Sequence, residues 1–242
     1  AWSHPTMSIW KKLAAATTEL GRPIGAMLDG GATQPEPSHH DQASGPENEV
    51  PFTVGVITLG AKMAKADGSV SSDEITAFKE AFRVSAGEMR QAAPVFNSAK
   101  RDATDFEACA AQLAALFAGN RKLLEDVLDG LFHIAKADDE LHPQEEQFLA
   151  RVAKLFGFSE SEFSSIKARH VAAAKRNPFD VLGVDPAIGD EDLKSHYLAL
   201  VAENEPEKLI ARGVPKEFIL IATERNLALG EAYEAIVRQR SS

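Results

Sequence analysis

Carboxylates recur at matching positions of two related motifs, and they are the first residues of this chain that suggest chemistry. Asp67 and Glu74 belong to the motif Ala-Asp-Gly-Ser-Val-x-x-x-Glu. Asp138 and Glu145 belong to Ala-Asp-Asp-Glu-Leu-x-x-x-Glu, 71 residues later. Carboxylate oxygens are the ligands that Ca²⁺ and Mg²⁺ prefer. These four residues are our candidate metal ligands, although Gly68 directly after Asp67 does not fit the spacing of an EF-hand loop.

Helix capping is the alternative interpretation of the same motifs, and we favour it. Ser71 and Glu74 stand three residues apart, as in a capping box at a helix N-terminus. In the second motif Pro143 suits the first helical position, and Glu145 takes the place of Glu74. A divalent cation at the four carboxylates is the one ligand we consider; no other cofactor is expected.

Nothing in the chain indicates an enzyme. It contains no glycine-rich phosphate loop and no nucleophile elbow. Its only cysteine, Cys109, lies in an apolar stripe at helical spacing, which predicts a buried thiol rather than a reactive one. Four histidines lack the spacing of metal ligands and are expected mostly at helix surfaces or boundaries: His133, His142, His170 and His196.

Two helical hairpins account for the repeat and predict the fold of the middle of the chain. Apolar residues recur at three- and four-residue intervals on both sides of each acidic motif. An intervening apolar stripe from Phe106 to Phe117 predicts one more helix. Because a lone hairpin cannot bury its apolar face, the copies should pack together. We predict an all-α fold with a helical bundle over residues 51–174.

Composition limits the partners and the compartment. The formal net charge of -10 argues against general binding to nucleic acid, and no apolar run reaches the ~18 residues of a membrane span. Residues 1–6 resemble the start of a streptavidin-binding tag, residues 7–29 predict an N-terminal helix, and residues 30–50 predict a flexible linker. The stretch 8–29 is amphipathic, and it either docks on the next domain or associates peripherally with a membrane or partner. A cytoplasmic location is expected.

The last quarter, residues 177–240, predicts a separate helical module. Asn177-Pro178-Phe179 begins a short apolar helix, and the acidic run 190–192 begins a second helix. That helix and a long final one should be antiparallel, joined by a loop that carries Pro206. The run Gly213-Val214-Pro215 marks the start of the final helix.

Taken together, these motifs resemble a known combination of domains. The paired acidic motifs look like those of TerB-type tellurite-resistance domains, and residues 177–240 resemble a J domain in order and spacing. A TerB-like domain followed by a J-like domain is similar to DjlA-type co-chaperones. That resemblance implies a DnaK-type chaperone as partner. It also implies contact residues in the J-like loop and the helix before it: Lys194, Tyr197, Glu205, Pro206, Glu207 and Lys208.

The sequence departs from the J-domain pattern where the partner would bind. The family has His-Pro-Asp in the loop, and this chain has Glu205-Pro206-Glu207. Where the family usually has basic residues just after the tyrosine, this chain has Leu198 and Ala199. We therefore expect impaired stimulation of the chaperone ATPase. The alternatives are a solvated loop on a scaffold or assembly adaptor, or a cation-responsive stress module that uses the acidic motifs.

Overall fold

A computed structural model describes residues 49–66, 76, 105–136, 141–172 and 175–241, without the side chains of 64–66 and 217. Every regular element in these ranges is a helix, so the predicted all-α class is confirmed for the described chain. None of these helices is long and apolar enough to cross a membrane. The predicted tag remnant, N-terminal helix and nearly all of the predicted linker, residues 1–48, lie outside the described residues.

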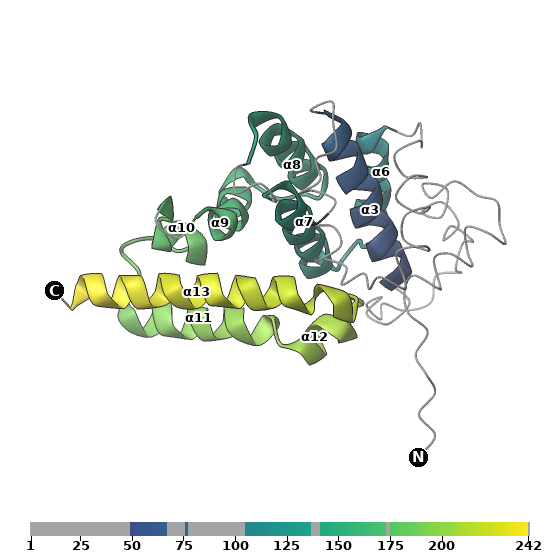
Figure 1. Ribbon diagram of the computed structural model, residues 1–242. Coiled ribbons are helices and arrows are strands. Elements are labelled where there is room, and N and C mark those ends of the chain that lie inside the picture. The colour runs from purple at the N-terminus through teal and green to yellow at the C-terminus, as the bar shows by residue number, and fades with distance from the viewer. Residues whose placement is uncertain (1–48, 67–75, 77–104, 137–140, 173–174, 242) are drawn as a thin grey trace, which may run out of the picture.

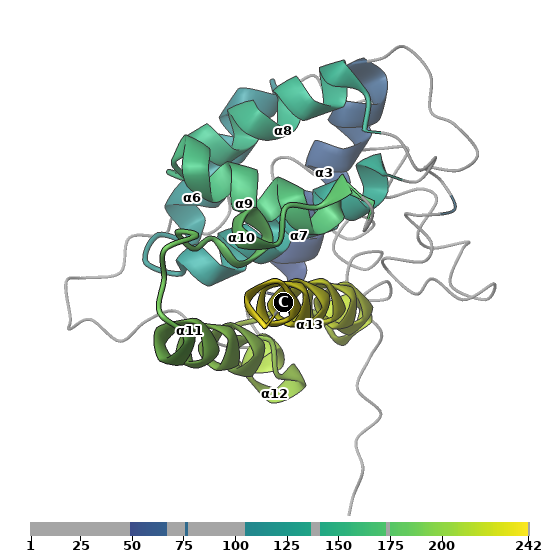
Figure 2. The same ribbon diagram turned by 90° about the vertical axis from the view of Figure 1, so that its left-hand side faces the viewer.

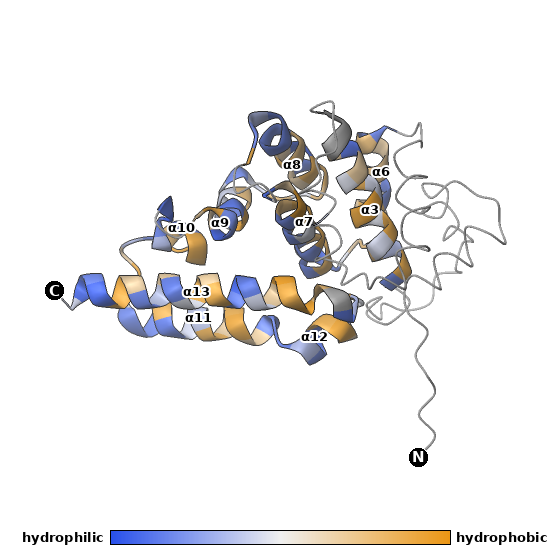
Figure 3. Ribbon diagram, in the orientation of Figure 1, coloured by the Kyte–Doolittle hydropathy of each residue, from blue (hydrophilic) through white to orange (hydrophobic). Residues whose placement is uncertain are grey.

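Five of the described helices form a bundle around one core. They are α3 (Glu49–Ala66), α6 (Phe106–Leu116), α7 (Arg121–Ala135), α8 (Pro143–Leu155) and α9 (Glu160–His170). α3 contacts α6, α7 and α8, and most of its described side chains are buried, including both threonines. A helix that is buried all round belongs to the centre of a core rather than to its surface. Figure 1 shows α3 beside α6 and α7, and Figure 3 shows how apolar it is.

Close helix packing in this bundle depends on a glycine. A Cβ atom added to Gly55 of α3 would lie 2.6 Å from Leu113 Cδ1 of α6, closer than real contacts allow. Gly55 therefore lets α6 approach the backbone of α3. The helix containing Cys109 and Leu113 confirms the predicted intervening helix, and Cys109 is buried as expected.

Both helices of the second predicted hairpin are present as α7 and α8, while residues 137–140 between them lie outside the described residues. Pro143 is the first residue of α8, where a missing N–H costs nothing because that group has no intrahelical partner. The corresponding turn and second helix of the first copy, residues 67–75 and 77–104, lie outside the described residues. The pseudo-repeat therefore stays a prediction for the first copy.

The C-terminal helices form a second layer. They are α10 (Pro178–Leu182), α11 (Asp190–Glu203), α12 (Pro206–Ala211), the 3-10 helix η3 (Lys216–Phe218) and α13 (Ile219–Arg240). α11 and α13 run antiparallel side by side, as predicted (Figures 1 and 2). A small core between α10, α11 and α13 contains Leu182, Leu193 and Leu229, and the rings of Tyr197 and Tyr233 stack at 4.5 Å.

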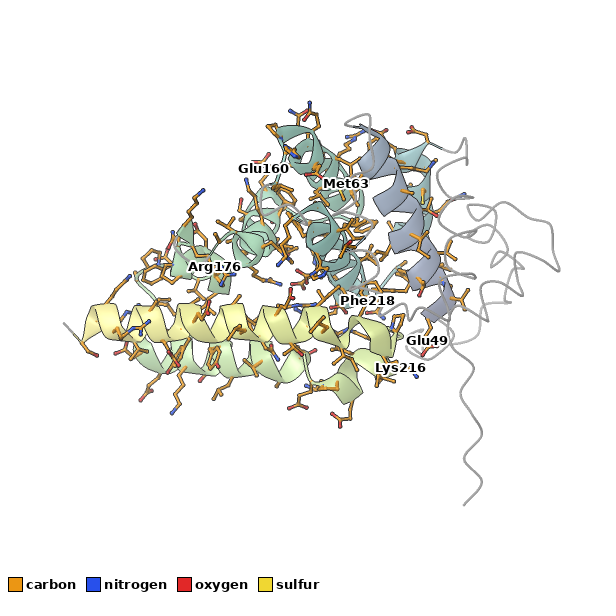
Figure 4. The ribbon with its side chains drawn as sticks, in the orientation of Figure 1. Glu49, Met63, Glu160, Arg176, Lys216 and Phe218 are labelled. Atoms are coloured by element: carbon orange, nitrogen blue, oxygen red, sulfur yellow. The ribbon has the colours of Figure 1, made fainter. Side chains whose placement is uncertain are left out.

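The main core of the bundle extends into this second layer. Leu209 of α12 and Ile221 of α13 belong to the same buried cluster as α3 and α7. Phe218 meets Phe52 of α3 edge to face, with ring centroids 4.9 Å apart. Figure 4 labels Phe218 where α13 begins, close to α3. The region before α13 is thus packed into the bundle, while the far end of α13 packs on α10 and α11.

Candidate functional site

The candidate site centres on residues 205–208, which we call the surface turn. All four side chains are exposed. The sequence predicts a loop here, whereas in the structure Pro206 is the first residue of α12 and Glu205 precedes it as N-cap. The amides of Lys208 and Leu209 donate to the Glu205 carbonyl at 3.0 and 3.1 Å. A helical turn forms because the fixed φ of proline suits the first helical position.

The charged side chains of the surface turn are mostly acidic. Glu205 and Glu207 carry two carboxylates, and Lys208 is the only cation of the four residues. Lys208 Nζ lies 3.1 Å from Glu203 Oε1, with both side chains 45% exposed. The hydrogen bond from Lys208 lowers the pKa of Glu203, which keeps that carboxylate charged. The turn therefore presents carboxylates and a partly neutralised lysine to solvent.

The other two predicted contact residues lie on α11, away from the surface turn. Lys194 is exposed near the start of that helix. Eleven residues separate it from Glu205, which is roughly 16 Å of helix. Tyr197 is half-buried against Tyr233, so much of its ring serves packing rather than contact with a partner. Leu198, in contrast, is 54% exposed.

A buried network of ions holds the surface turn in place, and its centre is Asp126 of α7. Arg212, directly after α12, donates from Nε to Asp126 Oδ2 at 2.7 Å and from the terminal nitrogen Nη2 to Oδ1 at 3.3 Å. Its third nitrogen donates to the Glu203 carbonyl at 2.9 Å. Arg212 therefore ties both the end of α11 and the end of α12 to the bundle.

Arg225 of α13 completes the attachment from the other side. One of its terminal nitrogens lies 2.6 Å from Asp126 Oδ1 and 2.9 Å from Asp129 Oδ2. The other donates to Asn204 Oδ1 at 3.0 Å, and Asn204 in turn donates to Asn226 at 2.9 Å. Because Asn204 and Arg212 bracket the surface turn, its backbone cannot move far without breaking buried hydrogen bonds.

The same network reaches α9. Arg169 pairs with Glu125 at 2.7 Å, and His170 Nε2 donates to Asp129 Oδ1 at 2.7 Å. Burial by itself would raise the pKa of Asp129, but Arg225, and after it His170, outweigh burial and hold that pKa far below its usual range. Burial lowers the pKa of His170, and the hydrogen bond with Asp129 and the charge of that carboxylate oppose the shift.

Sequence reasoning missed this network. It treats the histidines as mostly surface or boundary residues, and that is wrong for His133, which is buried with Nδ1 3.2 Å from Glu224 Oε2. No local signal was available in α7. Its apolar residues lie on one half of the helix and its carboxylates on the other, a pattern that predicts an exposed polar face, yet the structure buries both halves. Buried carboxylates need cationic partners, which only the distant helices supply.

The acidic motifs are described only in part. Glu145 is buried, and its Oε2 accepts from the His142 amide at 3.0 Å, so this carboxylate caps α8 as the capping interpretation predicts. Asp67, Glu74 and Asp138 lie outside the described residues. In the described part of the chain no three His, Cys, Asp or Glu side chains are placed to hold a metal ion. A cation site at the four carboxylates stays a prediction.

Comparisons with known proteins agree with this architecture. The family model of tellurite resistance protein TerB matches residues 53–168. Co-chaperone protein DjlA of Photobacterium profundum is 26% identical, over 83% of this chain and 82% of the relative. DjlA of Vibrio cholerae is 25% identical over 80% of both chains, and DjlA of Coxiella burnetii is 28% identical over 74% of both. No solved structure matches the chain significantly. The chain is therefore similar to DjlA co-chaperones over 74% to 83% of its length, and residues 53–168 match the TerB family.

Proposed function

We propose that this chain is a DjlA-like, J-type regulator that meets a DnaK-type chaperone at the surface turn and stimulates its ATPase poorly. The observation that carries the proposal is the exposed Pro206 at the start of α12, with glutamates where a J domain has histidine and aspartate. The order α10, α11, α13 and the name of the relatives, co-chaperone protein DjlA, support it. The role requires neither catalysis by this chain nor a cofactor.

Electrostatics around the surface turn explain the poor stimulation. Asp190, Glu191 and Asp192 fill the first turn of α11, and Lys194 is the only cation of that helix. The basic surface that would steer a J domain toward its partner is absent from α11. Complementary charge raises association rates by orders of magnitude, and like charges cost several kcal/mol in a complex. An acidic α11 should therefore slow binding to an acidic chaperone surface.

The test is ATP hydrolysis by a DnaK-type chaperone with the unmodified chain and with Glu205→His/Glu207→Asp. The unmodified chain should not raise turnover measurably, and the double variant should recover part of the stimulation at low salt. Glu234→His on α13 is the matched control, because it adds a histidine at an exposed position away from the turn. Equal stimulation by the unmodified and repaired chains would show that the glutamates are tolerated and would refute the proposal.

A second pair of substitutions distinguishes direct contact with the chaperone from electrostatic steering of its association. Adding Leu198→Arg and Ala199→Lys to the double variant should raise the association rate further. That gain should vanish in 0.5 M salt, where the Debye length falls to about 4 Å. A gain that survives high salt would mean that the new side chains make direct contacts instead.

A scaffold or assembly adaptor is the second candidate, and the exposure of Leu198 favours it. An exposed leucine where the family has a basic residue offers an apolar contact rather than steering. Leu198→Arg should then abolish the scaffold or adaptor role of the protein in cells, whereas Glu205→Ala should preserve that role. The opposite pattern would favour the chaperone-directed role.

A further inference from the structure

The segment that follows α12 is buried, although it connects two helices. Residues 212–215 are all buried, and the 3-10 helix η3 comes directly after them. Val214 and Phe218 belong to the main core of the bundle. Connections between helices usually run over the protein surface, because a buried backbone needs hydrogen-bond partners. The position of α12, and of the surface turn at its start, therefore depends on what this segment packs against.

α12 is joined to the buried segment by a well-defined helix end. Gly213 has φ of 93°, and its amide donates to the Ile210 carbonyl at 3.0 Å. The Val214 amide donates to the Leu209 carbonyl, also at 3.0 Å. These two hydrogen bonds form a Schellman motif, in which a left-handed glycine ends the helix. Because Leu209 and Val214 are buried in the same core, a shift of Val214 moves α12 and Pro206 with it.

Phe218 is the side chain that fixes this segment in the bundle. It is 2% exposed, and its ring meets that of Phe52 of α3 edge to face at 4.9 Å. The same ring lies against α7 at Gly130, where an added Cβ would be 2.8 Å from Phe218 Cε1. Real Cβ atoms essentially never come this close to another carbon. Phe218 therefore occupies space that a side chain at position 130 would take.

The packing around Phe218 leaves no room to absorb a shift of the ring. The cavity between α7, α12 and the start of α13 has a volume of only about 10 Å³. Leu209, Val214 and Phe218 line it, together with Asp126 and Arg225 of the ion network. A cavity of this size holds at most about one water molecule. Because a close-packed interior transmits strain, a displaced ring pushes on Val214 and Leu209.

We propose that Gly130 of α7 is a positioning residue for the surface turn. Without a side chain at this position, Phe218 packs against both α7 and α3, and the Schellman motif passes that position on to Pro206. This role is separate from that of the ion network, because Gly130 carries no charge. The TerB-like region is thereby part of the chaperone-contact site, although none of its residues lies in the surface turn. This consequence for the chaperone rests on the proposed function, whereas the position of the turn does not.

Amide hydrogen exchange of the full chain tests the positioning role directly. Gly130→Ala should push Phe218 away from α7 and accelerate exchange of residues 208–214 at least tenfold. Gly60→Ala on α3 is the matched control, because its Cβ would lie 3.3 Å from Ile134 Cδ1 in the same core. Both substitutions replace a helical glycine with alanine, so they change helix propensity alike. Gly60→Ala should change exchange of residues 208–214 less than twofold.

A compensating substitution separates positioning from general loosening of the core. Phe218→Leu removes part of the ring and should by itself accelerate exchange of residues 208–214 threefold or more. In Gly130→Ala/Phe218→Leu the new methyl group takes space that the ring leaves. The double variant should therefore exchange more slowly than either single variant, which is the coupling expected of residues in contact. If Gly130→Ala does not fold, recovery of the fold in the double variant is the expected result.

The chaperone contact is measured separately, as the Kd for a DnaK-type chaperone of the chain carrying Glu205→His/Glu207→Asp. Adding Gly130→Ala should raise that Kd at least fivefold, and adding Phe218→Leu as well should restore part of the affinity. An unchanged Kd would remove the TerB-like region from the contact site. Unchanged exchange in Gly130→Ala, equal acceleration in Gly60→Ala, or no compensation in the double variant would each overturn the positioning role. If the repaired chain binds no chaperone, the proposed function fails, and exchange still decides the positioning role.

Discussion

The surface turn and the network beneath it use the same kind of side chain in opposite ways. Glu205 and Glu207 are exposed carboxylates. Asp126 and Asp129 are buried carboxylates with guanidinium partners at 2.6 to 2.9 Å. Residues of the surface turn can therefore be substituted without loss of the fold. In the network, each substitution removes a partner of a buried charge.

The largest effect should come from removing the acceptor at the centre of the network. Asp126→Ala leaves the buried Arg212 without its carboxylate and removes one of the two carboxylates beside Arg225, and it should cost about 3–5 kcal/mol of unfolding free energy. Glu205→Ala should stay within about 0.5 kcal/mol of the unmodified chain. Urea unfolding measures both. Similar losses for the two variants would show that the turn and the network do not differ as described.

The second-largest loss of stability should come from shortening the buried side chain of Leu209, which anchors α12 in the main core. Leu209 follows the surface turn and is 1% exposed in the main core, so Leu209→Ala should cost about 2–4 kcal/mol. Amide hydrogen exchange across residues 204–212 should accelerate with it, because the anchor of α12 is lost. Ile210→Ala is the control, since Ile210 is exposed on the same helix. Unchanged exchange in the turn would mean that Arg212 alone positions it.

A smaller effect separates capping from cation binding at the acidic motifs. Glu145→Ala removes the acceptor of the His142 amide and should cost about 0.5–2 kcal/mol. Millimolar Ca²⁺ or Mg²⁺ should leave the Tm nearly unchanged. A large rise of Tm with either cation, lost in Asp67→Ala, would establish a site instead.

The smallest effect concerns pH. The hydrogen bond with His133, followed by the charges of His133 and Lys136, lowers the pKa of Glu224 to about 2 from an ordinary 4.5. A lowered carboxyl pKa stabilises the fold above the ordinary value, and that stability is lost as pH falls toward 2. The stability difference between the unmodified chain and Glu224→Gln should thus be greatest near pH 6, shrink below pH 4.5 and vanish as the pH falls through about 2. A difference that stays constant over this range would assign the effect to packing. Its size is modest because Glu224 is partly exposed.

Local sequence signals predicted most of the helices and several of their ends. Pro143 and Pro178 begin α8 and α10, the acidic run 190–192 begins α11, and Gly213-Val214-Pro215 precedes the final helical stretch. These signals act within one helical turn, so they can be interpreted without knowledge of the fold. The same locality explains the error at Pro206, which suits either a loop or a first helical turn.

Sequence patterns alone predicted most of the described helices and the resemblance to a TerB-type domain. The core that the bundle shares with the C-terminal helices, and the pairing of the buried charges, become apparent only in the folded chain. Asp126 meets Arg212 and Arg225 across 86 and 99 residues of chain. No local pattern encodes such pairs, because a buried carboxylate selects whichever cation the packing of distant helices brings within hydrogen-bond distance.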